Sequence, residues 1–380
     1  MIKLIQVSVD EFTLVLQPDI EVSSLEEWEF TANAMISEFI KLSRIEEVLG
    51  KLGKDDTKTN PSGYNTALHV LDKPYYLSIG YHTIYARMGV IIKLSSYSWC
   101  TYQAEYNNLY GEELTLSKFL HMIESSLYSY RLSRIDIAVD YKDYYEDHFL
   151  DSLYEALSNN NIKVVDSDNK TSYKTSSVIV KDNNINTIYL GSRKTNSRKF
   201  LRIYDKRLEQ IDNNGFNLLE AKKCKFSWIR IEASFRDSYS HHITHILNTC
   251  NDYSTTLLSI FLDKYRFIDV QEDKYCPWTD DLIKLLDDPD KKILRIENPR
   301  DNSIARRIMH LINDSGLFST MEKVRQIWGE NSDLILFMFL LKVYKSQRKK
   351  LSTNREILAF VRKHFDLHNI DFRDYLKTVL

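Results

Sequence analysis

The stretch Arg134-Ile-Asp-Ile-Ala-Val-Asp140 decides how this sequence folds. Alternate residues of a β-strand face opposite sides of a sheet, so the three apolar β-branched residues of this stretch share one face. Arg134, Asp136, Ala138 and Asp140 share the other face. The stretch therefore predicts a strand with one face for a hydrophobic core and one charged face. A single strand of this kind is also typical of a half-exposed antiparallel sheet.

Two later stretches, residues 199–206 and 228–235, repeat this alternation. In both, isoleucine and other apolar residues alternate with residues that carry a carboxylate, a phenol or a cationic group. The polar residues of interest in these two stretches are Arg202, Tyr204, Lys206, Arg230 and Glu232. Because three predicted strands carry polar residues of complementary chemistry, we favour a functional site on this face of the sheet over a face that only contacts water.

The acidic residues of these strands are candidate metal ligands. Asp136 and Asp140 are four residues apart, which separates them by about 13 Å along a strand, too far to bind one ion together. A metal would need one of them and an acid from a neighbouring strand, for which Glu232 is the candidate. Carboxylate oxygens favour Mg²⁺ or Mn²⁺ over zinc. The predicted metal ligands are therefore Asp136, Asp140 and Glu232, with the choice between the two aspartates open.

Tyr204 stands between Arg202 and Lys206 on the same predicted strand face. A phenol has an unperturbed pKa of about 10 and is a poor nucleophile at neutral pH, but nearby positive charge stabilises the phenolate. A metal ion and arginines would stabilise charge on a phosphate under attack. Because the chain contains 24 tyrosines, only this setting singles out Tyr204.

The composition is that of an ordinary globular protein, with 43% hydrophobic and 27% charged residues among 380. This length predicts two structural units or one enlarged domain with an appendage. Neither a P-loop nor a G-x-G-x-x-G motif occurs, so a nucleotide-fuelled motor is not expected. The four widely spaced cysteines favour a reducing compartment. Without a recognisable signal peptide or an apolar run of about 20 residues, we expect a soluble, cytoplasmic protein that does not enter a membrane.

The net charge is only −2, but the charges are clustered. Between Arg193 and Arg207 there are seven lysines and arginines and one aspartate, and a second basic cluster lies within residues 345–350. A chain polarised in this way can hold a polyanion along one stripe while staying near neutral overall. The alternative is a pair of solvated faces without specific contacts.

The pattern along the chain predicts an α+β fold, a mainly antiparallel sheet with helices on one face, followed by an all-α C-terminal region. Predicted strands are residues 2–16, 75–81, 85–94, 134–141, 228–235 and several within 163–204. Predicted helices are residues 25–49, 116–128, 148–159, 304–312, 318–328, 334–344 and 355–364. We divide the chain into an N-terminal α+β region (1–130), a region of polar-faced strands (131–240) and a helical region (241–380).

Four segments, in this order, resemble the Rep-trans family of rolling-circle replication initiators and related relaxases of plasmids, conjugative elements and phages. They are Ser133-Arg-Ile-Asp-Ile-Ala-Val-Asp140, Thr187-Ile-Tyr-Leu-Gly-Ser-Arg-Lys194, Lys199-Phe-Leu-Arg-Ile-Tyr-Asp-Lys-Arg-Leu-Glu209 and Trp228-Ile-Arg-Ile-Glu232. Each segment alone is a weak signal, but the set is specific. Residues 1–130 and the helical C-terminus are similar to the family only in general layout.

The resemblance implies an origin-specific DNA nickase in residues 131–240, which cuts one strand through a tyrosine, stays joined to the 5′ end and later rejoins it. Tyr204 matches the nucleophile, Asp136, Asp140 and Glu232 match the acidic residues, and Glu209 is a further acid. The cations expected to grip DNA or the scissile phosphate are Arg193, Lys194, Arg198, Lys199, Arg202, Lys206, Arg207 and Arg230. The resemblance also implies a divalent metal, double-stranded origin DNA and the nicked single strand as ligands, a host helicase as partner, and a homodimer.

The C-terminal helices are candidates for reading the origin, since origin specificity needs contacts to bases as well as to phosphates. Their cations are Arg306, Arg307, Arg325, Lys345, Arg348, Lys349 and Lys350, of which we favour Arg348 and Lys349 as DNA contacts. A helical dimerisation bundle is the alternative. The segment His241-His-Ile-Thr-His245 has neither the histidine spacing of the best-known nickases nor the glutamate of a metalloprotease helix, so we interpret it as ordinary polar residues.

Three other functions stay open at this point. A conjugative or mobilisation relaxase would perform the same chemistry on a transfer origin. A sequence-specific DNA-binding regulator would keep the fold without cutting, and a metal-dependent nuclease would use water in place of the tyrosine.

Overall fold

The structure is a computed structural model. It describes residues 4–20, 22, 24–144, 149–181, 183–194, 197–213, 215–287 and 316–354, and positions 304, 308, 311–312, 357–358, 361–362 and 369–379. The chain forms two compact units. The first consists of Met1–Tyr102 and Leu114–Asn298, and the second of Gln103–Glu113 and Pro299–Leu380.

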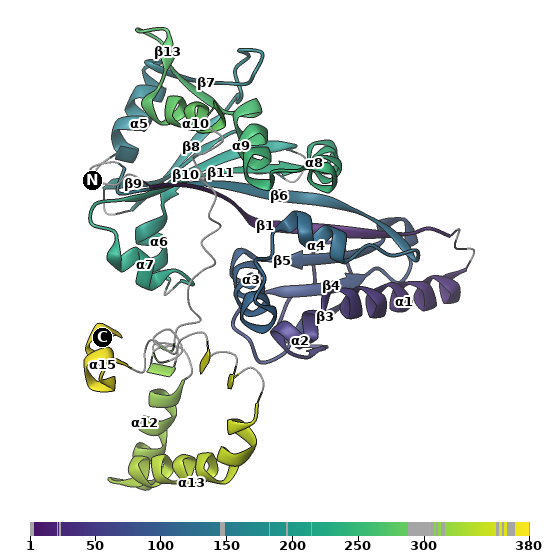
Figure 1. Ribbon diagram of the computed structural model, residues 1–380, viewed down its shortest axis with the longest axis vertical. Coiled ribbons are helices and arrows are strands. Elements are labelled where there is room, and N and C mark those ends of the chain that lie inside the picture. Colours follow the sequence, from purple (N-terminus) through teal and green to yellow (C-terminus); the bar gives the residue numbers. More distant parts are fainter. Residues whose placement is uncertain are drawn as a thin grey trace. The chain divides into compact units, whose positions relative to one another are not determined.

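The first unit is built on a ten-stranded antiparallel sheet with the strand order β2-β3-β4-β5-β1-β6-β11-β10-β9-β8 (Figure 1). Its strands are β1 (Leu4–Pro18), β2 (Leu52–Gly53), β3 (Thr66–Val70), β4 (Leu77–Tyr81), β5 (Val90–Leu94), β6 (Tyr128–Lys142), β8 (Ser176–Lys181), β9 (Asn184–Leu190), β10 (Lys199–Asp205) and β11 (Trp228–Arg236). A smaller sheet has the order β13-β12-β7 and contains β7 (Ile162–Val165), β12 (Arg266–Asp269) and β13 (Lys274–Tyr275). The prediction of a mainly antiparallel α+β fold is confirmed.

The two longest strands, β1 and β6, pair along their length at the centre of the large sheet. Their apolar residues oppose each other, as Val9 opposes Ile137. The register shifts between Val9 and Glu11, so Asp10 is an extra residue in β1, and such bulges redirect a side chain. This bulge lies beside the polar strands that the sequence singled out.

Helices cover the apolar face of β6, β11 and β10 (Figure 1). They are α5 (Phe149–Ser158), α8 (Ser238–Thr249), α9 (Tyr253–Lys264) and α10 (Pro277–Asp287). The Phe235 and Tyr265 rings lie 6.3 Å apart between centroids, and the Tyr141 hydroxyl donates to the Trp278 carbonyl oxygen at 3.2 Å. On the opposite side of these strands lie α6 (Lys206–Asp212) and α7 (Leu218–Lys223) (Figure 1).

The N-terminal half of the chain supplies α1 (Leu25–Ser43), α2 (Ile45–Leu49), α3 (Ser96–Tyr110), α4 (Leu116–Met122) and the short 3₁₀ helix η1 (Ala86–Met88). Ser24 caps α1, since its side chain accepts a hydrogen bond from the backbone N–H of Glu27 at 3.1 Å. The single helix predicted at residues 25–49 is two helices, because Arg44 adopts a left-handed conformation with φ of 53°. Similarly, η1 occupies the start of the strand predicted at residues 85–94.

The second unit contains α12 (Leu317–Trp328), α13 (Ser332–Ser352) and α15 (Phe372–Val379). None of the residues described in α13 is buried, and its first half exposes Ile335, Met338 and Phe339. The helix predicted at residues 334–344 continues to Ser352 and so includes the basic cluster. Arg306 and Arg307 lie outside the described residues, and the helices predicted at 304–312 and 355–364 lie only partly within them.

Several elements were not predicted from the sequence. α3 contains many tyrosines and small polar residues, so it lacks the apolar spacing that marks a helix. β3, β12 and β13 were also missed, and the last two interrupt the mainly helical region after residue 240. The division of the chain at residues 130 and 240 stays a prediction, although the large sheet takes strands from both sides of residue 130. No helix among the described residues is long and apolar enough to cross a membrane.

Candidate active site

Strand register brings the polar residues of β6, β11 and β10 into one cluster. Tyr204 lies opposite Arg230, which in turn lies opposite Asp140. In the next row on this face, Arg202 lies opposite Glu232. Directly opposed residues of neighbouring strands point to the same side of a sheet, so all these side chains share the face that lies opposite the apolar core. Asp136, opposite Ser234, lies on this face as well.

The side chain of Arg230 is buried and joins two aspartates. Its Nε and Nη2 donate to Asp140 Oδ1 and Oδ2, each at 2.7 Å, and its Nη1 donates to Asp10 Oδ1. Asp140 Oδ1 also accepts from the indole N–H of Trp228 at 2.7 Å, and Asp10 Oδ1 accepts from Ser96 at 2.8 Å. Burial disfavours the charged carboxylates, but Arg230 together with other nearby cations and hydrogen-bond donors outweighs burial, so the pKa of both aspartates is lowered. Arg230 is therefore held in place by charge-assisted hydrogen bonds.

Tyr204 is almost completely buried, with 2% of its surface exposed, yet its surroundings are polar. Its hydroxyl donates to Glu232 Oε2 at 3.2 Å. The guanidinium carbon of Arg202 lies 3.9 Å from the centroid of the Tyr204 ring, and Lys206 Nζ lies 5.6 Å from it. Tyr204 is the penultimate residue of β10, and the next residue, Asp205, caps α6 by accepting from the Leu208 N–H at 2.9 Å. The turn from β10 to α6 thus fixes the position of the Tyr204 side chain.

The pKa values of Tyr204 and Glu232 are both raised. Burial raises the pKa of Tyr204 well above 10, and the Glu232 carboxylate raises it further, while Arg230 and Arg202 offset this only in part. Burial and the carboxylates of Asp10 and Asp136 raise the pKa of Glu232 to about 8. The neighbouring cations do favour the phenolate, but burial and Glu232 outweigh them, so the pKa of Tyr204 is raised.

The remaining predicted catalytic residues surround this pair. Arg202 Nη1 lies 3.9 Å from Glu232 Oε2, and its buried Nε has no hydrogen-bond partner among the described residues. Lys206 Nζ pairs with Glu209 Oε2 at 2.9 Å, so Glu209 contacts a cation beside the phenol. A buried donor without a partner costs stability, and at a candidate site it indicates room for a ligand acceptor.

Asp136 belongs to a neighbouring ion-pair group. Its Oδ1 accepts from Arg134 Nε at 3.0 Å, and Arg134 also pairs with Glu11 Oε1 at 2.9 Å. Burial raises the pKa of Asp136 in spite of Arg134. Asp136 is thus on the same face as Glu232 but already has a cationic partner.

Sequence reasoning missed Asp10, Glu11, Ser96 and Trp228. Asp10 stands in a bulge that no alternation pattern reveals, and Ser96 begins a helix that was not predicted. Trp228 begins one of the predicted strands, but no role was predicted for it. It packs against Ala221 of α7 and Cys224 just after that helix, and its indole N–H orients Asp140.

The cations predicted to bind DNA divide between several places. Arg193 stacks on Tyr189, with its guanidinium carbon 4.4 Å from the ring centroid. Arg198 pairs with Asp237 at 3.5 Å, Arg207 donates to the Phe226 carbonyl at 3.4 Å, and Lys194 is exposed. Lys199 lies over Tyr265, on the sheet face opposite Tyr204, so the structure does not bring it to the cluster. Arg348 and Lys349 are exposed on α13 of the second unit.

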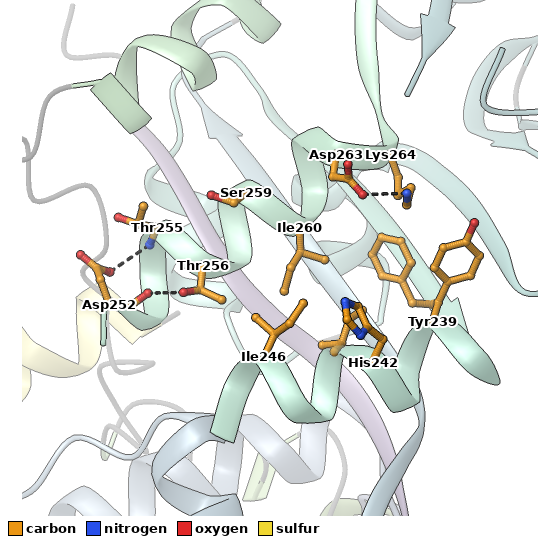
Figure 2. A pocket seen from close by; sticks show the side chains of 12 residues that line it. Tyr239, His242, Ile246, Asp252, Thr255, Thr256, Ser259, Ile260, Asp263 and Lys264 are labelled. Atoms are coloured by element: carbon orange, nitrogen blue, oxygen red, sulfur yellow. Dashed lines mark hydrogen bonds and ion pairs between the residues drawn. The ribbon is translucent and has the colours of Figure 1, made fainter. Parts of the chain in front are cut away.

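On the side of the sheet opposite Tyr204, a groove lies between α8 and α9. Figure 2 shows Ile246 and Ile260 on its walls and Tyr239, His242 and Lys264 at its rim. The segment from His241 to His245 lies in α8, and His241 Nε2 accepts from Arg131 Nε at 3.2 Å. No group of three or more histidine, cysteine or acidic side chains placed to hold a metal occurs among the described residues.

A family model described as replication initiation factor (Rep-trans) matches residues 130–336, more than half of the chain. The chain belongs to this replication initiation factor family. The part that matches the Rep-trans model includes β6, β9, β10 and β11 with Tyr204 and Glu232, but β1 with Asp10 lies outside it.

Among solved structures, a rolling-circle replication initiator protein from Geobacillus stearothermophilus is similar to this Rep-trans chain at 14% sequence identity and a TM-score of 0.45. The similarity covers 74% of this chain and 97% of that one. No curated protein matches the sequence.

Proposed function

We propose that this Rep-trans protein initiates rolling-circle replication by nicking one strand of an origin, with Tyr204 as the nucleophile and a 5′-phosphotyrosyl intermediate. The observation that carries the proposal is the hydrogen bond from the Tyr204 hydroxyl to Glu232, in a buried cluster of carboxylates and guanidinium groups. Burying so much charge is costly, and such clusters gather where chemistry requires them.

In the proposed reaction, the Tyr204 oxygen bonds to the scissile phosphorus as the bond from phosphorus to the 3′ oxygen breaks. The phenol proton passes to the Glu232 carboxylate, which already accepts the hydrogen bond from the Tyr204 hydroxyl at 3.2 Å. The 3′ oxygen takes up that proton and leaves as a hydroxyl. The reverse reaction, with a 3′ hydroxyl attacking the phosphotyrosine, closes the strand without an external energy source.

The cations have two proposed roles. Arg202, whose Nε has no partner among the described residues, and Lys206 lie over the Tyr204 ring and would stabilise negative charge on the phenolate and the phosphate. Arg230 is engaged by Asp140 and Asp10 through three of its nitrogen atoms. We therefore propose that Arg230 positions the strands around the site rather than binding the phosphate.

A divalent metal is part of the proposal. Of the three acidic residues predicted as its ligands, Glu232 fits that role better than Asp136 and Asp140. Glu232 has a raised pKa because it is buried and because the carboxylates of Asp10 and Asp136 are close to it, a situation that a bound cation would relieve. Asp140 accepts three hydrogen bonds and Asp136 is paired with Arg134, so Glu232 fits a hard cation better than either. Bound there, Mg²⁺ or Mn²⁺ would neutralise charge on the scissile phosphate.

The second unit is proposed to make the remaining contacts. The first half of α13 exposes apolar side chains, and its last turns carry Arg348 and Lys349. An exposed apolar surface of this kind indicates a protein contact, and a basic helix end suits DNA phosphates. We propose that α13 joins a second copy of the chain or a host helicase through its first half and origin DNA through its second.

The test is a nicking assay on supercoiled plasmid that carries the origin of the protein's own genetic element, with Mg²⁺ or Mn²⁺. Wild type should produce relaxed circles and a protein-linked 5′ end, and Tyr204→Phe should produce neither while still binding the origin. Tyr275→Phe is the matched control, because it removes a phenol hydroxyl from β13 of the smaller sheet, which carries none of the cluster residues, and it should nick normally. A covalent adduct formed by Tyr204→Phe would exclude the proposed nucleophile, and a wild type that binds the origin without cutting it would indicate a regulator.

A further inference from the structure

We propose that two stacked pairs, Arg193 on Tyr189 and Arg236 on Phe200, form a binding track for the single-stranded DNA that flanks the scissile phosphate. In each pair the ring lies beneath and the guanidinium plane above it offers a platform for a nucleobase. This inference rests on the proposed function, because it assigns the path of the substrate strand to and from Tyr204.

The register places both pairs on the face of Tyr204. Tyr189 of β9 lies opposite Arg202, and Phe200 lies two residues before Arg202 on β10. Phe200 lies opposite Ser234, and Arg236 follows two residues later on the same face of β11. From Tyr204 to Phe200 the strand rises by about 13 Å, enough for a few nucleotides.

The rings are buried and the cations above them are accessible. Tyr189 and Phe200 are 9% and 6% exposed, whereas Arg193 is exposed and Arg236 is half-buried. The guanidinium carbons lie 4.4 Å and 5.1 Å from the respective ring centroids. An aromatic ring holds a guanidinium group flat and leaves its second face free, and bases stack on such planes as they do on aromatic rings. The arrangement is therefore a layered platform whose outer layer is cationic.

The charge of the track is balanced only in part by the protein, since Asp136 and Glu11 act on Arg236 from beyond ion-pair distance. Arg236 lies directly opposite Arg134 in the ladder, an unfavourable pairing of like charges. Burial and Arg134 lower the pKa of Arg236, and no carboxylate within ion-pair distance of Arg236 or Arg193 occurs among the described residues. Excess positive charge beside a candidate phosphate-cutting site is relieved by a bound polyanion.

The connection between β9 and β10 fixes the spacing of the two pairs. Gly191 begins it with φ of 100°, a conformation that residues with a side chain rarely adopt. A Cβ atom at this position would also lie 3.3 Å from the Cα and Cβ of Phe200. The glycine thus lets the backbone that leads to Arg193 pass close to Phe200.

The experiment measures how a fluorescein-labelled oligothymidylate binds the Tyr204→Phe protein, which separates binding from cutting. Arg193→Lys and Arg236→Lys keep the charge but lose the plane, and each should weaken binding about fivefold or more, the effect of losing one stacked base. Tyr189→Leu should weaken binding as much as Arg193→Lys, and the double variant no further, because ring and guanidinium act as one platform. Equal affinity of the lysine variants and the parent would overturn the proposal.

Three controls keep the result specific. Arg87→Lys changes an exposed arginine of η1, which carries none of the track residues, and it should bind as the parent does. Tyr189→Phe retains the ring and should also retain binding, so a loss there would count against stacking. Arg193→Gln should reduce the slope of log affinity against log salt by about 0.7, whereas Arg193→Lys should leave the slope unchanged.

The two proposals fail in different ways. A wild type that never nicks, combined with lysine variants that lose oligothymidylate binding, would refute the nickase and leave the track standing. A wild type that nicks, combined with lysine variants that bind normally, would refute the track and leave the nickase standing.

Discussion

The two halves of the ten-stranded sheet bury very different side chains. Among the residues described in β2, β3, β4 and β5, His69 is the one acidic or basic side chain that is buried. In β6 and the strands beyond it, the buried acidic and basic side chains are Asp136, Asp140, Lys142, Arg230 and Glu232. Strand β1 joins the halves and contributes Asp10 to the charged one.

The difference teaches that the fold itself does not need these charges. The first half forms antiparallel strands of the same kind with an almost purely apolar interior. Burying ions costs several kcal/mol per group, and hydrophobic replacements of similar volume are often neutral or stabilising. The charged half therefore indicates a site where stability is given up for chemistry, and three experiments test that conclusion.

The largest effect is expected from Arg230→Met, which leaves Asp140 and Asp10 buried without their cation. The free energy of unfolding should fall by about 3–5 kcal/mol, as measured by urea unfolding. Adding Asp10→Asn and Asp140→Asn to this variant should restore much of the loss, because the uncompensated charges are then gone. A loss below about 1 kcal/mol in the single variant would mean that the network does not hold the strands, and the contrast between the halves would lose its energetic basis.

A smaller change of opposite sign is expected from Glu232→Gln. This substitution removes one of several crowded carboxylates, whose mutual repulsion and burial raise the pKa of Glu232 to about 8. Each pKa unit by which folding raises the value corresponds to a cost of about 1.4 kcal/mol for the charged carboxylate. Removing a cost of that size should raise the free energy of unfolding by about 1 kcal/mol at neutral pH, as measured by urea unfolding. Nicking should be lost at the same time.

Glu209→Gln is the matched control, since Glu209 is partly exposed and should change stability by no more than about 0.5 kcal/mol. If Glu232→Gln were destabilising, the carboxylate would be part of the structural framework and the exchange of stability for function would not apply to it.

Much of the charged half could be predicted from the sequence, because strand alternation is a local property. The alternation around Asp136 and Asp140, and around Arg230 and Glu232, was enough to put these residues on one face. Their partners were not predictable in the same way. Only the pairing of β11 with β6 places Arg230 opposite Asp140, where the two charges neutralise each other.

Two features could not be predicted from the sequence because they depend on contacts between distant parts of the chain. Asp10 reaches Arg230, 220 residues later, from a bulge that the sequence does not mark. The sequence showed that cations flank Tyr204 and favour its phenolate, but it did not show that burial raises the pKa by more than they lower it. Local pattern predicts which side chains share a sheet face, whereas their partners across the sheet and their desolvation are set by the whole fold.

The smallest effect concerns His69, the buried histidine of β3 in the first half. Burial lowers its pKa below 6.5, so the folded state favours the neutral ring and the unfolded state takes up a proton first as the pH falls. The stability that His69 permits is fully present above pH 6.5 and declines as the pH drops through that value toward its folded pKa. His69→Phe retains a ring to contact Tyr76, whose centroid lies 5.7 Å away, and should flatten the decline in urea unfolding measured between about pH 7 and pH 5. An unchanged decline in His69→Phe would assign the acid sensitivity to the charged half instead, and the contrast between the halves would then extend to their response to pH.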